Sequence, residues 1–288
     1  MLETNPIFEF EVVNLKLQTK KSDAEKLEAY KAIILKLVEL KCHSAVSENQ
    51  HLIMYSAYQK KTETGIEYIY GRLGKGIYFD NKNGRSLDIE SSTTEEEEYD
   101  TSKLYNPDYT DYVFIPSAHR LCVQLGNKIT ASQVRRFLIS NASQVIQYGD
   151  KIAVEIQKEE TAISELLTAK KVHKLDYSIS YTNDDTLGAA ASLFDRRLKR
   201  SQIGKVNVKA EADHNDYMNI EGEEILEGGI ELAKGNGNIN SAEITTSDGE
   251  RKTVTTKDKA KRIKIQSDYE SFRTAIVNRI MLLFRNEE

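Results

Sequence analysis

The chain has 288 residues, of which 39% are hydrophobic and 30% are charged, so it can build a sizeable core and is not a disordered protein. Its formal net charge of −5 comes from 40 basic and 45 acidic side chains, which excludes a uniform polycation but leaves room for a local basic patch. Two distant cysteines, Cys42 and Cys122, exclude a CxxC zinc site and do not support a disulfide framework, and no segment resembles a signal peptide or a membrane span, so we expect a cytosolic protein.

The first 106 residues predict an N-terminal α+β lobe. Apolar and polar side chains alternate in its first strand, and the next segment has an N-cap serine and an apolar stripe at helical spacing. Later segments are rich in aromatic and β-branched residues, which favour strands. These patterns predict a strand at 8–17, a helix at 22–40, a strand pair at 52–58 and 66–73, and a short third strand at 76–79.

Two loops are predicted in this lobe. The glycine-rich basic stretch 71–76 lies between two predicted strands and is not followed by a helix, so we expect a strand connection rather than a phosphate-binding loop. Residues 81–106 contain four consecutive glutamates and few apolar anchors, so we expect an acidic mobile loop at the end of the lobe.

The rest of the chain divides into two predicted segments. Residues 107–185 predict a central lobe with the order β-β-α-β-α-β, and residues 186–288 predict a helix, basic strands, a hairpin around Asp248-Gly249 and an amphipathic C-terminal helix. The predicted elements lie at 112–116, 120–125, 131–143, 151–156, 163–167, 174–181, 186–200, 204–210, 225–233, 241–246, 252–256, 262–265 and from 268 onward. The predicted fold class is therefore α+β, with two lobes that each contain a mostly antiparallel sheet and flanking helices, followed by the C-terminal helix.

Catalytic and metal-binding motifs give little support for an enzyme. Glu155 and Lys158 suggest a metal-dependent nuclease, but residues three apart on a strand point to opposite faces, so we expect the two side chains to diverge unless a bulge intervenes. The five histidines form no HxH or HxxxH pair, and there is no GxSxG motif. We therefore expect no cofactor and no metal, and leave the nuclease as a minor alternative.

Basic clusters are the more informative feature. No acidic side chain interrupts the basic residues between 196 and 209, and a second cluster runs from Arg251 to Lys264. Alternation places the lysines of 205–209 on the face opposite the valines, and the cations of 262–265 opposite the isoleucines, so two strands could form one phosphate-binding platform. The alternative is a solvated face balanced by the acidic stretch 211–231. The candidate nucleic-acid-binding residues are Arg135, Arg136, Arg196, Arg197, Lys199, Arg200, Lys205, Lys209, Arg262 and Lys264.

Four stretches of the chain resemble a bacterial family that is known only as domain of unknown function 4747. They lie at 112–121, 129–137, 176–185 and 249–258. The resemblance implies a link with anti-phage defence, because members of such families tend to lie beside defence genes. In size and layout the chain also looks like RexA of phage exclusion and the KwaB subunit of Kiwa, an architectural analogy that implies DNA binding.

These observations lead to a principal hypothesis and a rival. The first is an anti-phage defence component that binds nucleic acid, in particular duplex DNA without sequence specificity, and that forms a homodimer or joins a partner defence protein. The rival is a protein-interaction module or toxin subunit whose acidic segment 95–100 docks a basic partner.

Overall fold

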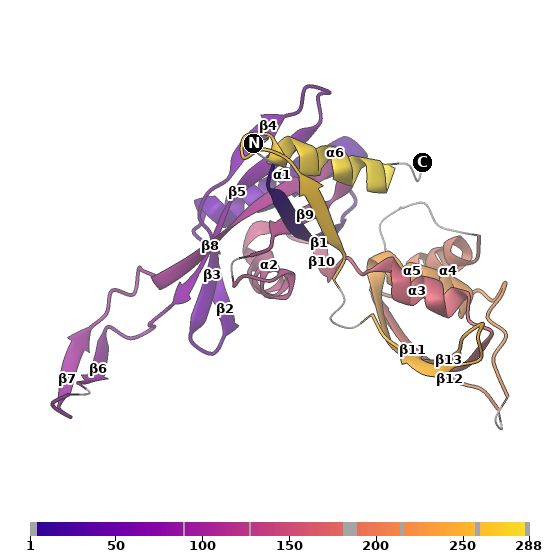
Figure 1. The fold of residues 1–288 in the computed structure, drawn as a ribbon. Helices are drawn as coiled ribbons and strands as arrows, with labels where there is room; N and C mark the ends of the chain where they lie inside the picture. Colours follow the sequence, from indigo (N-terminus) through magenta and orange to yellow (C-terminus); the bar gives the residue numbers. More distant parts are fainter. Residues whose placement is uncertain are drawn as a thin grey trace.

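The computed structural model describes residues 5–88, 90–126, 128–180, 189–213, 216–256 and 260–285, which form two sheet-and-helix units and a projecting hairpin (Figure 1). The larger sheet has nine strands, and each strand runs antiparallel to its hydrogen-bonded neighbours. Its strands are β1 (Ile7–Gln18), β2 (His43–Ser47), β3 (Gln50–Met54), β4 (Tyr58–Lys61), β5 (Glu67–Ile77), β8 (Tyr105–Ile115), β9 (Arg120–Gln124), β10 (Lys151–Ile156) and β15 (Arg262–Gln266).

Helices cover both faces of the nine-stranded sheet. On β1, Val13, Leu15 and Leu17 face the core beneath α1 (Asp23–Glu39) and α2 (Ala131–Val145). The alternate residues Phe8, Phe10 and Val12 face the C-terminal helix α6 (Phe272–Arg285). The period-two alternation of one strand therefore supplies two hydrophobic cores.

Strand β5 is continuous through the glycine-rich stretch, so the predicted connection at 71–76 is wrong. The absence of a side chain at Gly71 explains the local arrangement, because a Cβ there would lie only 1.9 Å from the carbonyl oxygen of Ser56. Ser56 belongs to the short break that separates β3 from β4, and both of these strands pair with β5. The segment predicted as one strand at 52–58 is accordingly two strands, while β2 is a strand that the sequence patterns missed.

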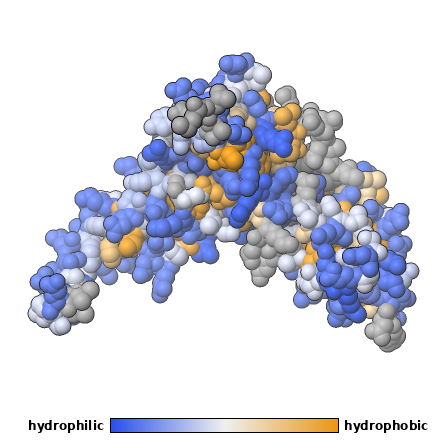
Figure 2. All heavy atoms as spheres, in the orientation of Figure 1, coloured by the Kyte–Doolittle hydropathy of each residue, from blue (hydrophilic) through white to orange (hydrophobic). Residues whose placement is uncertain are grey.

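The smaller sheet has four antiparallel strands in the order β12-β11-β13-β14. Its inner face packs against three helices through a separate core, and its outer face carries polar side chains. In the view of Figure 2 the surface of this unit and of the projecting hairpin is mostly hydrophilic. The elements are α3 (Glu160–Leu167), β11 (Lys171–Ser180), α4 (Ala189–Arg200), β12 (Lys205–Glu211), α5 (Glu227–Asn236), β13 (Gly237–Thr245) and β14 (Arg251–Val254).

The predicted start of α4 at 186–188 lies outside the described residues. The hairpin expected around Asp248-Gly249 is present, because β13 pairs with β14 on either side of it.

The acidic segment forms a hairpin arm. Strands β6 (Asn83–Leu87) and β7 (Thr94–Glu98) pair with each other, and every side chain of β7 is exposed. Three aromatic rings lie near its base, where Phe79 stacks on Tyr99 at 3.8 Å between ring centroids and Tyr105 contacts Phe79 edge-on at 5.5 Å. The segment therefore has apolar anchors that the composition did not suggest, and its mobility stays a prediction.

The sheets do not follow the predicted segments 1–106, 107–185 and 186–288. Strand β1 pairs with β9 and β10 from the second segment and with β15 from the third, and residue 106 lies inside β8. The backbone groups of a strand are satisfied by whichever strands lie beside it, and local sequence patterns do not identify those partners. The predicted fold class is confirmed, because the chain is α+β with antiparallel sheets, flanking helices and a C-terminal helix.

Candidate nucleic-acid interface

Six of the predicted residues lie on the smaller unit, on α4 and on the edge strand β12, and we call this group the basic ridge. The cations of α4 belong to the helix layer, and the lysines of β12 lie on the opposite face of the sheet. Helix α4 buries Ala191 and Phe194 on one side, and its arginines Arg196 and Arg200, four residues apart, are exposed. The ridge consists of Arg196, Arg197, Lys199, Arg200, Lys205 and Lys209.

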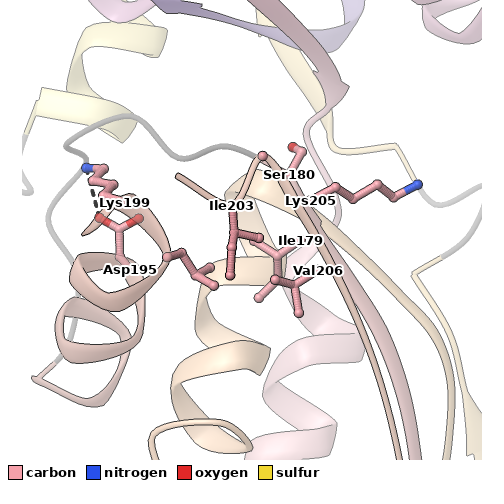
Figure 3. Close-up of a pocket in the computed structure, with 9 residues that line it drawn as sticks. Ile179, Ser180, Asp195, Lys199, Ile203, Lys205 and Val206 are labelled. Carbon is pink, nitrogen blue, oxygen red and sulfur yellow. Dashed lines mark ion pairs between the residues drawn. The ribbon is translucent and has the colours of Figure 1, made fainter. Parts of the chain in front are cut away.

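Strand β12 contributes its two lysines by alternation. Val206 and Val208 pack against the core of the smaller unit, while Lys205 and Lys209 are exposed on the opposite face. Figure 3 shows the side chain of Lys205 extending away from the hollow between α4 and the strands. Because β12 is an edge strand of its sheet, these lysines lie at a border of the unit rather than within a covered surface.

The cations of the ridge differ in whether a carboxylate neutralises them. Ion pairs join Arg197 Nη1 to Glu224 Oε2 at 3.1 Å, Lys199 Nζ to Asp195 Oδ2 at 2.8 Å and Lys209 Nζ to Asp176 Oδ2 at 3.5 Å. Arg196, Arg200 and Lys205 are exposed, and within the described part of the chain none of the three forms an ion pair. These three side chains carry the uncompensated positive charge of the ridge.

Among the described residues, the hollow beneath the ridge is too small to hold a ligand. This hollow, lined by Ser180, Asp195, Lys199 and Lys205 among others, has a volume of about 10 Å³, which is room for a single water molecule (Figure 3). Any anion that these cations bind therefore lies on the outer surface.

The predicted platform of two basic strands is wrong. Strand β12 belongs to the four-stranded sheet and β15 to the nine-stranded sheet, so the two strands do not form one surface. Arg262 and Lys264 also lie opposite glutamates of β1, with Arg262 Nε 3.7 Å from Glu11 Oε1 and Lys264 Nζ 2.7 Å from Glu9 Oε1. The Lys264 ammonium lowers the pKa of Glu9, so this carboxylate remains ionised at neutral pH. The cations of β15 are neutralised within the sheet.

The two arginines of α2 bind the protein itself. The side chain of Arg135 donates to the carbonyl oxygen of Val154 at 2.8 Å and lies 3.8 Å from Glu155. Arg136 is exposed but donates from Nη1 to the carbonyl oxygen of Val46 at 2.5 Å. Both arginines join α2 to neighbouring strands and lie apart from the basic ridge.

Glu155 and Lys158 both line one hollow of about 390 Å³ beside β10 and β13, and the divergence of their side chains stays a prediction. Strand β10 ends at Ile156, so the alternation of side chains along the strand does not determine the direction of the Lys158 side chain. Glu155 is the one carboxylate among the described residues that line this hollow, and no group of three or more histidine, cysteine, aspartate or glutamate side chains in the described ranges could hold a metal ion. The pair of carboxylates that a metal-dependent nuclease needs is therefore not assembled by these residues.

Among the described helices, none is long and apolar enough to cross a membrane.

Comparisons with known sequences address the whole chain. A comparison with curated proteins finds no similar sequence. The model of the family described as Domain of unknown function (DUF4747) matches residues 7–282, nearly the full length. The chain is a member of this DUF4747 family.

Proposed function

We propose that the chain binds the sugar–phosphate backbone of duplex DNA through the basic ridge. The observation that carries the proposal is the group of three exposed cations, Arg196, Arg200 and Lys205, which form no ion pair with the described carboxylates. A surface cation without an intramolecular partner can neutralise a phosphate without first breaking an ion pair. The release of condensed counterions from DNA then supplies the favourable free energy.

The chemistry of the ridge favours backbone contacts over base recognition. Arginine offers a planar fork of donors that suits a phosphate, and lysine offers a point charge on a flexible stem. Contacts of this kind hold a protein on DNA but do not discriminate between sequences. We therefore propose binding without sequence specificity.

The resemblance to defence-associated proteins supports a role in anti-phage defence, acting as a homodimer or with a partner defence protein. A second candidate function rests on the hairpin arm. Glu95 to Glu98 are all exposed on β7, so the arm could dock a basic protein, and in that case the chain would need no nucleic-acid binding of its own.

Binding to labelled duplex DNA at about 50 mM salt tests the proposal, because nonspecific complexes weaken steeply as salt is added. The variant R196E/R200E/K205E should bind at least roughly tenfold more weakly than the unaltered protein. The control K20E/K36E/K41E reverses three exposed lysines elsewhere and makes the same change in net charge. Equal losses in both variants, or no duplex binding by the unaltered protein, would overturn the proposal.

A further inference from the structure

Tyrosine rings gather on the part of the nine-stranded sheet that α6 leaves uncovered. Register places Tyr70 of β5 opposite Tyr58 of β4, and the two ring centroids lie 5.4 Å apart. A second pair, Tyr55 and Tyr109, has ring centroids 5.5 Å apart. We call the surface of these four residues the tyrosine face.

The rings are accessible from outside. Tyr58 is 57% exposed, Tyr109 is 47% exposed and Tyr55 is 43% exposed. Tyr70 is half-buried because the guanidinium of Arg273, in the first turn of α6, lies 4.7 Å from its ring centroid. Helix α6 therefore borders the tyrosine face without covering it.

A cation lies between the two ring pairs. Along β5 one face presents Tyr70, Arg72 and Gly74 in turn, and the ring of Tyr109 lies over Gly74. Four residues of strand span about 13 Å, so the rings of Tyr70 and Tyr109 are separated by roughly that distance, and the exposed Arg72 lies between these positions along β5.

The charge of this surface is positive. Arg72 Nε and Arg273 Nη2 each lie 3.0 Å from one oxygen of the same carboxylate, Asp111. One carboxylate thus serves two guanidinium groups, and the exposed Lys60 lies two residues from Tyr58 on the same face of β4. The surface combines aromatic rings with more cations than anions.

We propose that the tyrosine face binds single-stranded nucleic acid, with bases stacked on the two ring pairs and a phosphate on Arg72. Nucleobases stack on aromatic side chains whatever their sequence, and a separation of about 13 Å suits two nucleotides of an extended strand. A duplex cannot use this surface in the same way, because its bases are stacked inside the helix. The surface is separate from the basic ridge, so this proposal does not depend on duplex binding.

Two labelled probes of equal length test the proposal, namely an oligothymidylate of about 15 nucleotides and the same backbone without bases. The ratio of the two affinities isolates the contribution of the bases from that of the phosphates. In the unaltered protein the oligothymidylate should bind more tightly. Loss of one ring should weaken stacking by about fivefold or more, so Y58A/Y109A should weaken oligothymidylate binding by about 25-fold and leave the baseless probe nearly unchanged.

Three variants complete the test. Y58F/Y109F keeps both rings and should bind like the unaltered protein, and Y148A/Y217A removes two exposed tyrosines elsewhere and should also have no effect. R196E/R200E/K205E should keep the ratio between the two probes, which separates this surface from the ridge. The proposal is overturned if the unaltered protein binds both probes equally or binds neither, or if folded Y58A/Y109A retains the ratio. Absence of binding would leave a protein partner as the occupant of this face.

Discussion

Replacing Phe272 with alanine tests how the C-terminal helix α6 is held against β1, the N-terminal strand of the nine-stranded sheet. Phe272 begins α6 and is 3% exposed, and its ring stacks on Phe8 of β1 at 4.6 Å and lies 6.3 Å from Phe10. Removing a buried phenylalanine costs about 3–5 kcal/mol, which includes the aromatic contacts and the cavity left behind.

That free energy corresponds to a measurable change in melting temperature. A 288-residue chain has an unfolding entropy of about 0.6 kcal/mol/K near 60 °C, so a loss of about 4 kcal/mol lowers the melting temperature by about 7 °C. If the two units melt separately, the shift is larger and confined to the transition of the nine-stranded unit. Differential scanning calorimetry measures both cases.

Tyr269→Ala is the matched control for this substitution. Tyr269 contacts the same Phe8 ring edge-on at 5.4 Å, but it is 73% exposed. Its replacement should cost less than about 1 kcal/mol, because little surface is buried there. A melting temperature of Phe272→Ala within about 2 °C of the unaltered protein would refute the packing of α6 on β1.

Three further predictions concern pH, reactivity and proteolysis. Lys31 and then Lys61 lower the pKa of Glu67 to about 2, so Glu67 stabilises the fold above about pH 4.5 and this contribution is lost as the pH falls toward 2. Glu67→Gln should therefore lower the free energy of unfolding at pH 7. A loss of stability in this variant that is as large at pH 2 as at pH 7 would contradict the ion pairs. Burial raises the pKa of the Cys122 thiol, so a thiol reagent at pH 8 should modify it only after denaturant is added, and rapid modification of the folded protein would contradict its burial. Limited proteolysis should cut first within 81–106, and cleavage elsewhere before that segment would argue against a mobile arm.

Local patterns in the sequence predicted most of the elements of this fold. The alternation in β1 and the N-cap and apolar stripe of α1 each depend on neighbouring residues, so their signals are readable without tertiary information. The pairing of β1 with β15 joins residues at opposite ends of the chain. No local periodicity specifies such a partner, which is why the predicted segments cut across the larger sheet.

The candidate site shows the same limit. The exposure of Lys205 and Lys209 followed from alternation within one strand, whereas the neutralisation of Lys264 by Glu9 required knowledge of the neighbouring strand. The tyrosine face was missed for a related reason. Tyr58, Tyr70 and Tyr109 lie on three strands, β4, β5 and β8, and only the pairing of these strands brings their rings onto one face.

The salt dependence of duplex binding tests the central claim most directly. If about four cations of the basic ridge contact phosphates, the logarithm of the association constant should fall with the logarithm of salt concentration with a slope of about −3 to −4. Charge reversal in K205E/K209E should reduce the magnitude of that slope by roughly one unit for each lost contact, equally for different DNA sequences. An unchanged slope in the folded double variant would contradict the account, as would a duplex affinity that does not depend on salt.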